Sequence, residues 1–146
     1  MTLHSVRGRS LFVAPIRVAL GVVWLVAARL AGAASAAALL AFAGGVFVTC
    51  FTLLNDPRTR LLPQREPKPA PVHAPVASPA RQALAALMPS TVGVSFLAAV
   101  AIAVQAVLTA LLGGICAGLG VAGAFAALRI DPRLYVEPKS GALYRR

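Results

Sequence analysis

Residues 11–54 have the sequence LFVAPIRVALGVVWLVAARLAGAASAAALLAFAGGVFVTCFTLL, which is apolar almost throughout. A second apolar stretch runs from Leu84 to Leu128. One membrane crossing needs about 20 apolar residues, because the hydrocarbon core is about 30 Å thick. Each stretch is therefore too long for one crossing and suits two. The sequence predicts an all-α membrane protein, with four transmembrane helices arranged as two helical hairpins.

The composition supports this fold class. Of the 146 residues, 59% are hydrophobic, and the mean hydropathy is +0.81, values that are unusual for a water-soluble domain. None of the polar segments is long enough to form a core of its own. The predicted organisation is an N-terminal segment at 1–11, a first hairpin at 12–54, a Pro-rich basic linker at 55–85, a second hairpin at 86–129 and a basic tail at 130–146.

The net charge is +10, and the basic residues flank the apolar stretches. Cytoplasmic loops carry an excess of Lys and Arg, so these positions orient helices in a membrane. If each hairpin crosses twice, every Lys and Arg except Arg29 falls on one side. The pattern predicts a multi-pass protein of a bacterial inner (plasma) membrane, with both termini and the linker in the cytoplasm. It disfavours nucleic-acid binding, because that function needs a basic soluble domain.

The first apolar run has a second interpretation, as a cleaved signal peptide. Val18 to Ala28 is apolar and is followed by small residues at 31–36, as in secretory signals. However, Arg29 lies between the run and the cleavage site, and cleavage would leave a chain that begins inside a membrane helix. A retained helix is the favoured interpretation.

A shift of 75 residues aligns the two halves of the chain at a few matching residues, mainly those that end helices. The Asp-Pro-Arg triplet at 56–58 falls on the triplet at 131–133, and Gly45 falls on Gly120. Because each half contains two crossings, the halves would run in the same direction across the membrane. The sequence therefore predicts a parallel internal repeat.

The repeat also locates the second turn. The first hairpin turns at 29–35, so the shift places the second turn at 104–110 and Gly113-Gly114 inside the fourth helix. Small residues every four positions let helices approach closely, and we expect them to close the hairpins; they are Ala37, Ala41, Gly45, Gly114, Gly118 and Ala122. Bulky residues are then left for lipid or a partner: Trp24, Phe42, Phe47, Phe51, Phe96 and Phe125.

The linker contains a proline-rich segment at 67–75. Proline fixes φ and lacks a backbone donor, so this segment is predicted to be an extended, polyproline-like strap that links the hairpins. Ser78-Pro79 is typical of a helix start. The stretch 81–88 is predicted to lie along the membrane interface before Pro89 bends the chain into the third crossing.

The Asp-Pro-Arg triplets have a structural and a functional interpretation. In the structural one, which is favoured, each triplet stops a helix as it leaves the membrane. In the functional one, Arg58 and Arg133 form a pseudo-symmetric basic pair that binds a lipid phosphate or a partner's acidic patch. Asp56 and Asp131 would then orient the two guanidinium groups.

Arg17 and Arg29 lie within an apolar stretch, where a charge is expensive and often functional. They are about 18 Å apart along a helix. We expect both side chains to extend to opposite interfaces. If Arg17 instead faces the helix bundle, it is a candidate for pairing with an acidic residue of another subunit, because the membrane part of this chain has no carboxylate.

The sequence contains no recognisable catalytic, metal or cofactor site. The predicted depths of Cys50 and Cys116 differ by about 14 Å, too far for a disulfide. His4 and His73 lie in separate polar segments. We find no nucleophile–base pair, phosphate-binding loop or metal-ligand spacing. The sequence predicts a protein that is not an enzyme and holds no cofactor.

Three functional hypotheses remain. The first is a non-catalytic accessory, assembly or scaffolding subunit of a larger bacterial inner-membrane complex, whose partners are other membrane protein subunits. The second is a small oligomeric channel or transporter, suggested by the parallel repeat. The third is a membrane-organising protein whose basic segments bind anionic phospholipid head groups.

Overall fold

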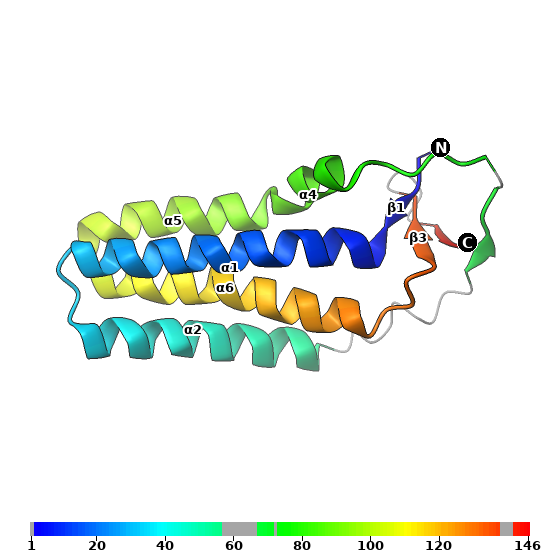
Figure 1. Ribbon diagram of the computed structural model, residues 1–146. Coiled ribbons are helices and arrows are strands. Elements are labelled where there is room, and N and C mark those ends of the chain that lie inside the picture. Colours follow the sequence, from blue (N-terminus) through cyan, green and yellow to red (C-terminus); the bar gives the residue numbers. More distant parts are fainter. Residues whose placement is uncertain (1, 57–66, 72, 138–141) are drawn as a thin grey trace.

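The computed structural model describes residues 2–56, 67–71, 73–137 and 142–146. In these residues the helices lie side by side, and short strands gather at one end together with both termini (Figure 1). The helices are α1 (Val6–Leu30), α2 (Ser35–Asn55), α4 (Pro79–Leu87), α5 (Ser90–Val104) and α6 (Ala106–Leu128). The strands are β1 (His4–Ser5), β2 (Lys68–Pro69), β3 (Leu134–Val136) and β4 (Leu143–Arg145).

Three helices are long and apolar enough to cross a membrane, namely α1, α2 and α6, with 25, 21 and 23 residues. The prediction of a mainly helical, membrane-embedded protein is therefore confirmed. Helix α5 has 15 residues, which is about 22 Å at 1.5 Å per residue and short for a crossing. It passes the same test only together with α4, from which it is bent by 49°.

Both turns at the far end of the bundle fall within their predicted ranges. Helix α1 ends at Leu30 and α2 begins at Ser35. Gly32 lies in this turn with φ +95°, a conformation that glycine adopts without steric cost. Helices α5 and α6 are separated by Gln105 alone, which is extended. Gly113 and Gly114 lie inside α6, as the repeat predicted.

Helix α6 is the central helix of the bundle and packs against α1, α2 and α5 (Figure 1). Its diglycine presents one glycine to each of two neighbours. A Cβ on Gly113 would lie 2.8 Å from the carbonyl oxygen of Gly21 in α1, and a Cβ on Gly114 would lie under 3.0 Å from that of Phe42 in α2. Glycine thus lets the backbones of two helices touch α6 on two faces.

We had expected the small-residue stripes to close the two hairpins. The structure shows that they do not. A Cβ on Gly45 in α2 would lie 2.5 Å from the carbonyl oxygen of Leu111 in α6. The two stripes thus face each other across the halves of the chain. Helices α1 and α2 are joined by the turn at 31–34, but each packs mainly on α6. The spacing of small residues predicts close approach, but it does not say which helix approaches.

The strands form a four-stranded sheet in the order β1-β3-β4-β2. Strand β3 pairs antiparallel with β1 and β4, while β2 pairs parallel with β4. Leu3 is fully buried beside this sheet, its N–H donates to Pro75 and its carbonyl accepts from Ala77. We call the four strands, Leu3 and residues 73–77 the cap.

The cap changes the interpretation of the polar segments. The strap expected at 67–75 is extended, but Lys68-Pro69 is a strand of the sheet rather than part of a free linker. Pro69 lies on an edge strand, where its missing N–H breaks no ladder. The N-terminal segment, the linker and the tail are each too short for a core, and together they enclose Leu3 and Leu143.

Candidate functional site

The predicted residues at the helix ends do not form one site in the described part of the chain. Arg58 lies outside the described residues. Asp56 directly follows α2. Asp131 and Arg133 follow α6, at the start of the tail. The predicted basic pair of Arg58 and Arg133 thus stays a prediction.

Asp131 contacts Arg133 through the backbone. Its Oδ1 accepts a hydrogen bond from the backbone N–H of Arg133 at 2.9 Å, which is the turn typical of aspartate. Its Oδ2 forms an ion pair with Arg145 at 3.1 Å. The carboxylate of Asp131 therefore links the end of α6 to strand β4, and the guanidinium that it orients is that of Arg145.

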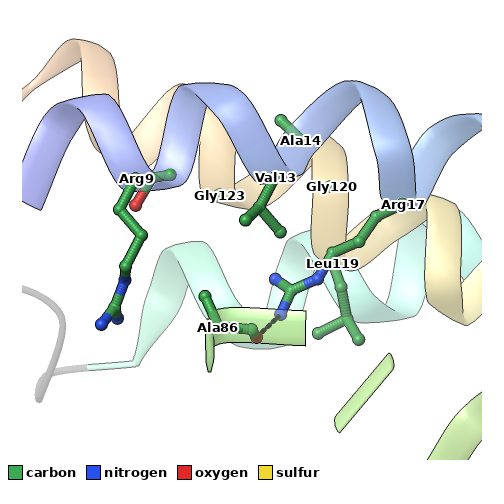
Figure 2. A pocket seen from close by; sticks show the side chains of 9 residues that line it. Arg9, Val13, Ala14, Arg17, Ala86, Leu119, Gly120 and Gly123 are labelled. Carbon is green, nitrogen blue, oxygen red and sulfur yellow. Dashed lines mark hydrogen bonds between the residues drawn. The ribbon is translucent and has the colours of Figure 1, made fainter. Parts of the chain in front are cut away.

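Arg17 is the predicted residue whose surroundings differ most from the expectation. Its Nε donates to the hydroxyl of Thr91 at 2.9 Å. Its Nη2 donates to the carbonyl of Ala86 and to the hydroxyl of Ser90, both at 3.1 Å. The side chain extends from α1 towards α4 (Figure 2). The contact with α4 and α5 was not expected, and the extension of Arg17 to a membrane interface stays a prediction.

The bend between α4 and α5 explains this contact. Ala86 lies in the last turn of α4, where backbone carbonyls lack an intrahelical partner and carry partial negative charge. Ser90 and Thr91 open α5 and add two hydroxyl oxygens. Arg17 thus donates to a backbone carbonyl at the end of one helix and to two side-chain hydroxyls at the start of the next. Its guanidinium fixes the bend against α1.

A pocket of about 90 Å³ lies beside Arg17, between α1, α4 and α6. Arg9 and Arg17 both extend from α1 to the same side of that helix (Figure 2). The lining is completed by Ser10, Val13, Ala14, Ala86, Leu119, Gly120 and Gly123. The site is thus a small pocket that carries two guanidinium groups.

Two glycines of α6 have different roles at this pocket. A Cβ on Gly120 would lie 2.7 Å from the carbonyl oxygen of Ala14, so Gly120 allows α1 and α6 to touch. A Cβ on Gly123 would meet no atom within 4 Å. Gly123 therefore faces open space, and a side chain at this position would enter the pocket without a backbone collision.

Other polar groups in the bundle hold helices together. The indole N–H of Trp24 donates to Ser95 of α5 at 3.3 Å. Thr109 donates to the carbonyl of Ala98 at 3.2 Å. Trp24 is half-buried and packs against Gly113, whereas we had assigned it to the face left for lipid or a partner. The buried Cys116 lies 3.5 Å from the carbonyl oxygen of Arg17, and both Cys50 and Cys116 are free thiols.

The sequence analysis missed Arg9, Ser90 and Thr91. One signal was present: Arg17 and Thr91 lie the same number of residues before Leu30 and Val104, where α1 and α5 end. Equal distances from the two turns place the two side chains at the same depth. The carbonyl of Ala86 leaves no trace in the sequence, because every residue has a backbone carbonyl.

Comparison with protein-family models, with curated protein sequences and with solved structures finds no match to this chain. Among the described residues, no three His, Cys, Asp or Glu side chains lie close enough together to hold a metal ion. That the protein uses no metal or cofactor stays a prediction from the sequence.

Proposed function

We propose that this chain is a non-catalytic integral membrane protein, an accessory, assembly or scaffolding subunit of a larger bacterial inner-membrane complex. The cap carries this proposal. It is a folded platform at one end of the bundle, and its exposed side chains include Lys68 and Arg145, with Arg133 and Arg146 beside them. The opposite end consists of the turn at 31–34 and the break at Gln105. A partner with an acidic surface therefore has a built docking face on one side of the membrane.

The proposed topology places the cap in the cytoplasm, in line with its basic charge. We take the bent pair of α4 and α5 as a fourth crossing, in which α4 lies at the membrane interface and α5 runs through the hydrocarbon layer. This puts an even number of crossings between the two termini. The parallel repeat stays a prediction from the shift of 75 residues. The two helices that it equates do not pack alike, since α6 contacts three helices and α2 packs mainly on α6.

The packing of α6 argues against a solute path through a single copy of the chain. The contacts of Gly21, Gly45, Gly113 and Gly114 place backbone atoms of facing helices against one another. These contacts fill the centre of the bundle with main chain. A solute path would therefore have to run between copies of the chain rather than through one.

The test is the native mass of the full chain, purified from its own membrane in mild detergent at its endogenous level. We expect a large complex with other polypeptides at fixed stoichiometry. In the double variant Arg133→Glu and Arg146→Glu, we expect these polypeptides to be lost while the chain stays folded. Arg29→Gln, which changes a charge at the other end of the bundle, is the control and should retain them. A chain that elutes alone, or as a homo-oligomer, would overturn the proposal and make solute flux in liposomes the next assay.

A further inference from the structure

Arg17 has a positive charge without a charged partner among its three hydrogen bonds. Its acceptors are one carbonyl and two hydroxyls. A charge inside a membrane is costly unless an opposite charge lies beside it. The described acidic residues Asp56, Asp131 and Glu137 lie beyond the ends of α2, α6 and β3. The chain itself thus supplies hydrogen bonds to Arg17 from the bend, but these acceptors carry no net negative charge.

Arg9 brings a second cation to the same pocket. It lies two helical turns from Arg17, and its side chain extends to the same side of α1 (Figure 2). Two guanidinium groups on one side of a helix repel each other, and an anion between them converts this repulsion into attraction. The hydrogen bonds to α4 and α5 use Nε and Nη2 of Arg17. Within the described residues, the two N–H groups of Nη1 remain for an anion.

The pocket has space for that anion. Its volume is about 90 Å³, whereas a cavity needs only about 15 Å³ by this measure to hold one water molecule. Guanidinium N–H groups form charge-assisted hydrogen bonds with phosphate oxygens, which makes arginine a preferred residue for phosphate recognition. The shape and the charge together fit a phosphate group.

The depth of the pocket indicates a lipid rather than a soluble anion. Arg17 lies about 20 Å from the end of α1 at Leu30, and Arg9 lies about 12 Å further towards the cap. In a hydrocarbon core about 30 Å thick, the pocket then runs from the interface into the apolar layer. Phospholipid phosphates lie at this interface.

Helix α4 supplies a surface for the acyl chains. Its residue Ala86 lines the pocket, and its neighbours Leu84 and Met88 are 68% and 59% exposed. Gln82 and Ala83 are buried on the other face. An amphipathic helix of this kind lies along a membrane interface with its apolar face in the lipid. We infer that the pocket between α1, α4 and α6 binds the phosphate of an anionic phospholipid, with Arg9 and Arg17 as its cationic ligands.

The test uses Gly123→Leu, which fills the pocket, and Gly44→Leu on α2 as a matched control. A Cβ at either glycine meets no atom within 4 Å, so both variants should fold. The full chain is purified in detergent, and binding of phosphatidylglycerol and phosphatidylcholine is measured by native mass spectrometry. We expect one tightly bound phosphatidylglycerol per chain and weaker binding of phosphatidylcholine.

Gly123→Leu and Arg9→Gln are each expected to weaken phosphatidylglycerol binding at least tenfold, while Gly44→Leu leaves it unchanged. Arg9→Gln is preferred to a change at Arg17, which also fixes the bend. Unchanged binding in Gly123→Leu would overturn the inference. Complete displacement of the lipid by millimolar inorganic phosphate would also overturn it, and would identify a site for a free anion. Neither measurement depends on a partner protein, so failure of the lipid-binding inference can be distinguished from failure of the proposed function.

Discussion

The bundle and the cap of this protein are held together in different ways. Around α6, the closest contacts are made by glycines that bring backbone atoms together, as at Gly21 and Gly114. In the cap, the fully buried Leu3 is surrounded by paired strands, and its own backbone bonds to Pro75 and Ala77. Lipid gives helices no hydrophobic reason to associate, so close approach provides the attraction. In the cap, apolar burial and paired strand edges hold the structure together instead.

The largest effect is expected in the bundle, from the addition of one methyl group. In Gly114→Ala the new Cβ would collide with the carbonyl of Phe42, a backbone atom that cannot turn aside. Overpacked cores lose about 1–3 kcal/mol and occasionally more, and we expect the upper end here. The free energy of unfolding can be measured in detergent through Trp24, the one tryptophan of the chain.

Gly44→Ala is the matched control for this change. A Cβ at Gly44 meets nothing within 4 Å, so the better helix propensity of alanine should raise stability by up to about 1 kcal/mol. The same substitution thus has opposite signs at two positions. Equal losses in both variants would show that the bundle does not depend on close approach to α6.

A smaller and more local effect is expected in the cap from Leu3→Ala. Truncating a buried leucine costs about 2–5 kcal/mol, and the low end is expected because the cap is small and can collapse around the gap. Backbone amides of β1 and β3 should exchange hydrogen faster, while the fluorescence of Trp24 stays as in the wild type. Val76→Ala is the control, because Val76 is 43% exposed beside the same residue. A loss of stability that reaches Trp24 would mean that cap and bundle unfold as one unit.

The contrast between the bundle and the cap also explains which features the sequence could predict. Long apolar stretches predict membrane-spanning helices, and the shift of 75 residues placed the second turn at 104–110, where the break at Gln105 lies, and kept Gly113 and Gly114 in one helix. The sequence did not show that α6 lies between α1 and α2, because a stripe of small residues suits close packing against any other helix that carries such a stripe. The cap had no signal, since strands of two or three residues are too short for a detectable alternation.

Arg17 shows the limit most clearly. Its position inside an apolar stretch marked it as costly, and two outcomes were stated for it: an interface, or an acidic residue of another subunit. The structure shows a contact that neither outcome included, with a bend whose acceptors are Ala86, Ser90 and Thr91. A helix carbonyl is free to accept from a side chain only in the last turn of the helix, so this acceptor exists because α4 ends at Leu87, just before Pro89.

The smallest effect is expected from removing the charge of Asp131, a change that tests whether charge or burial stabilises the cap. Asp131 pairs with Arg145 at 3.1 Å, but the two side chains are 34% and 59% exposed. Exposed ion pairs contribute about 0–1 kcal/mol. Asp131→Asn keeps an oxygen that can accept from the N–H of Arg133 and removes the charge. We expect hydrogen exchange in β4 to rise slightly at low salt and to match the wild type near 1 M salt, where the screening length falls to about 3 Å. If Asp131→Asn instead loosens β1 and β3 as much as Leu3→Ala does, the cap is held by its charges. The bundle would then be held by close packing and the cap by its charges, with little contribution from the burial of Leu3.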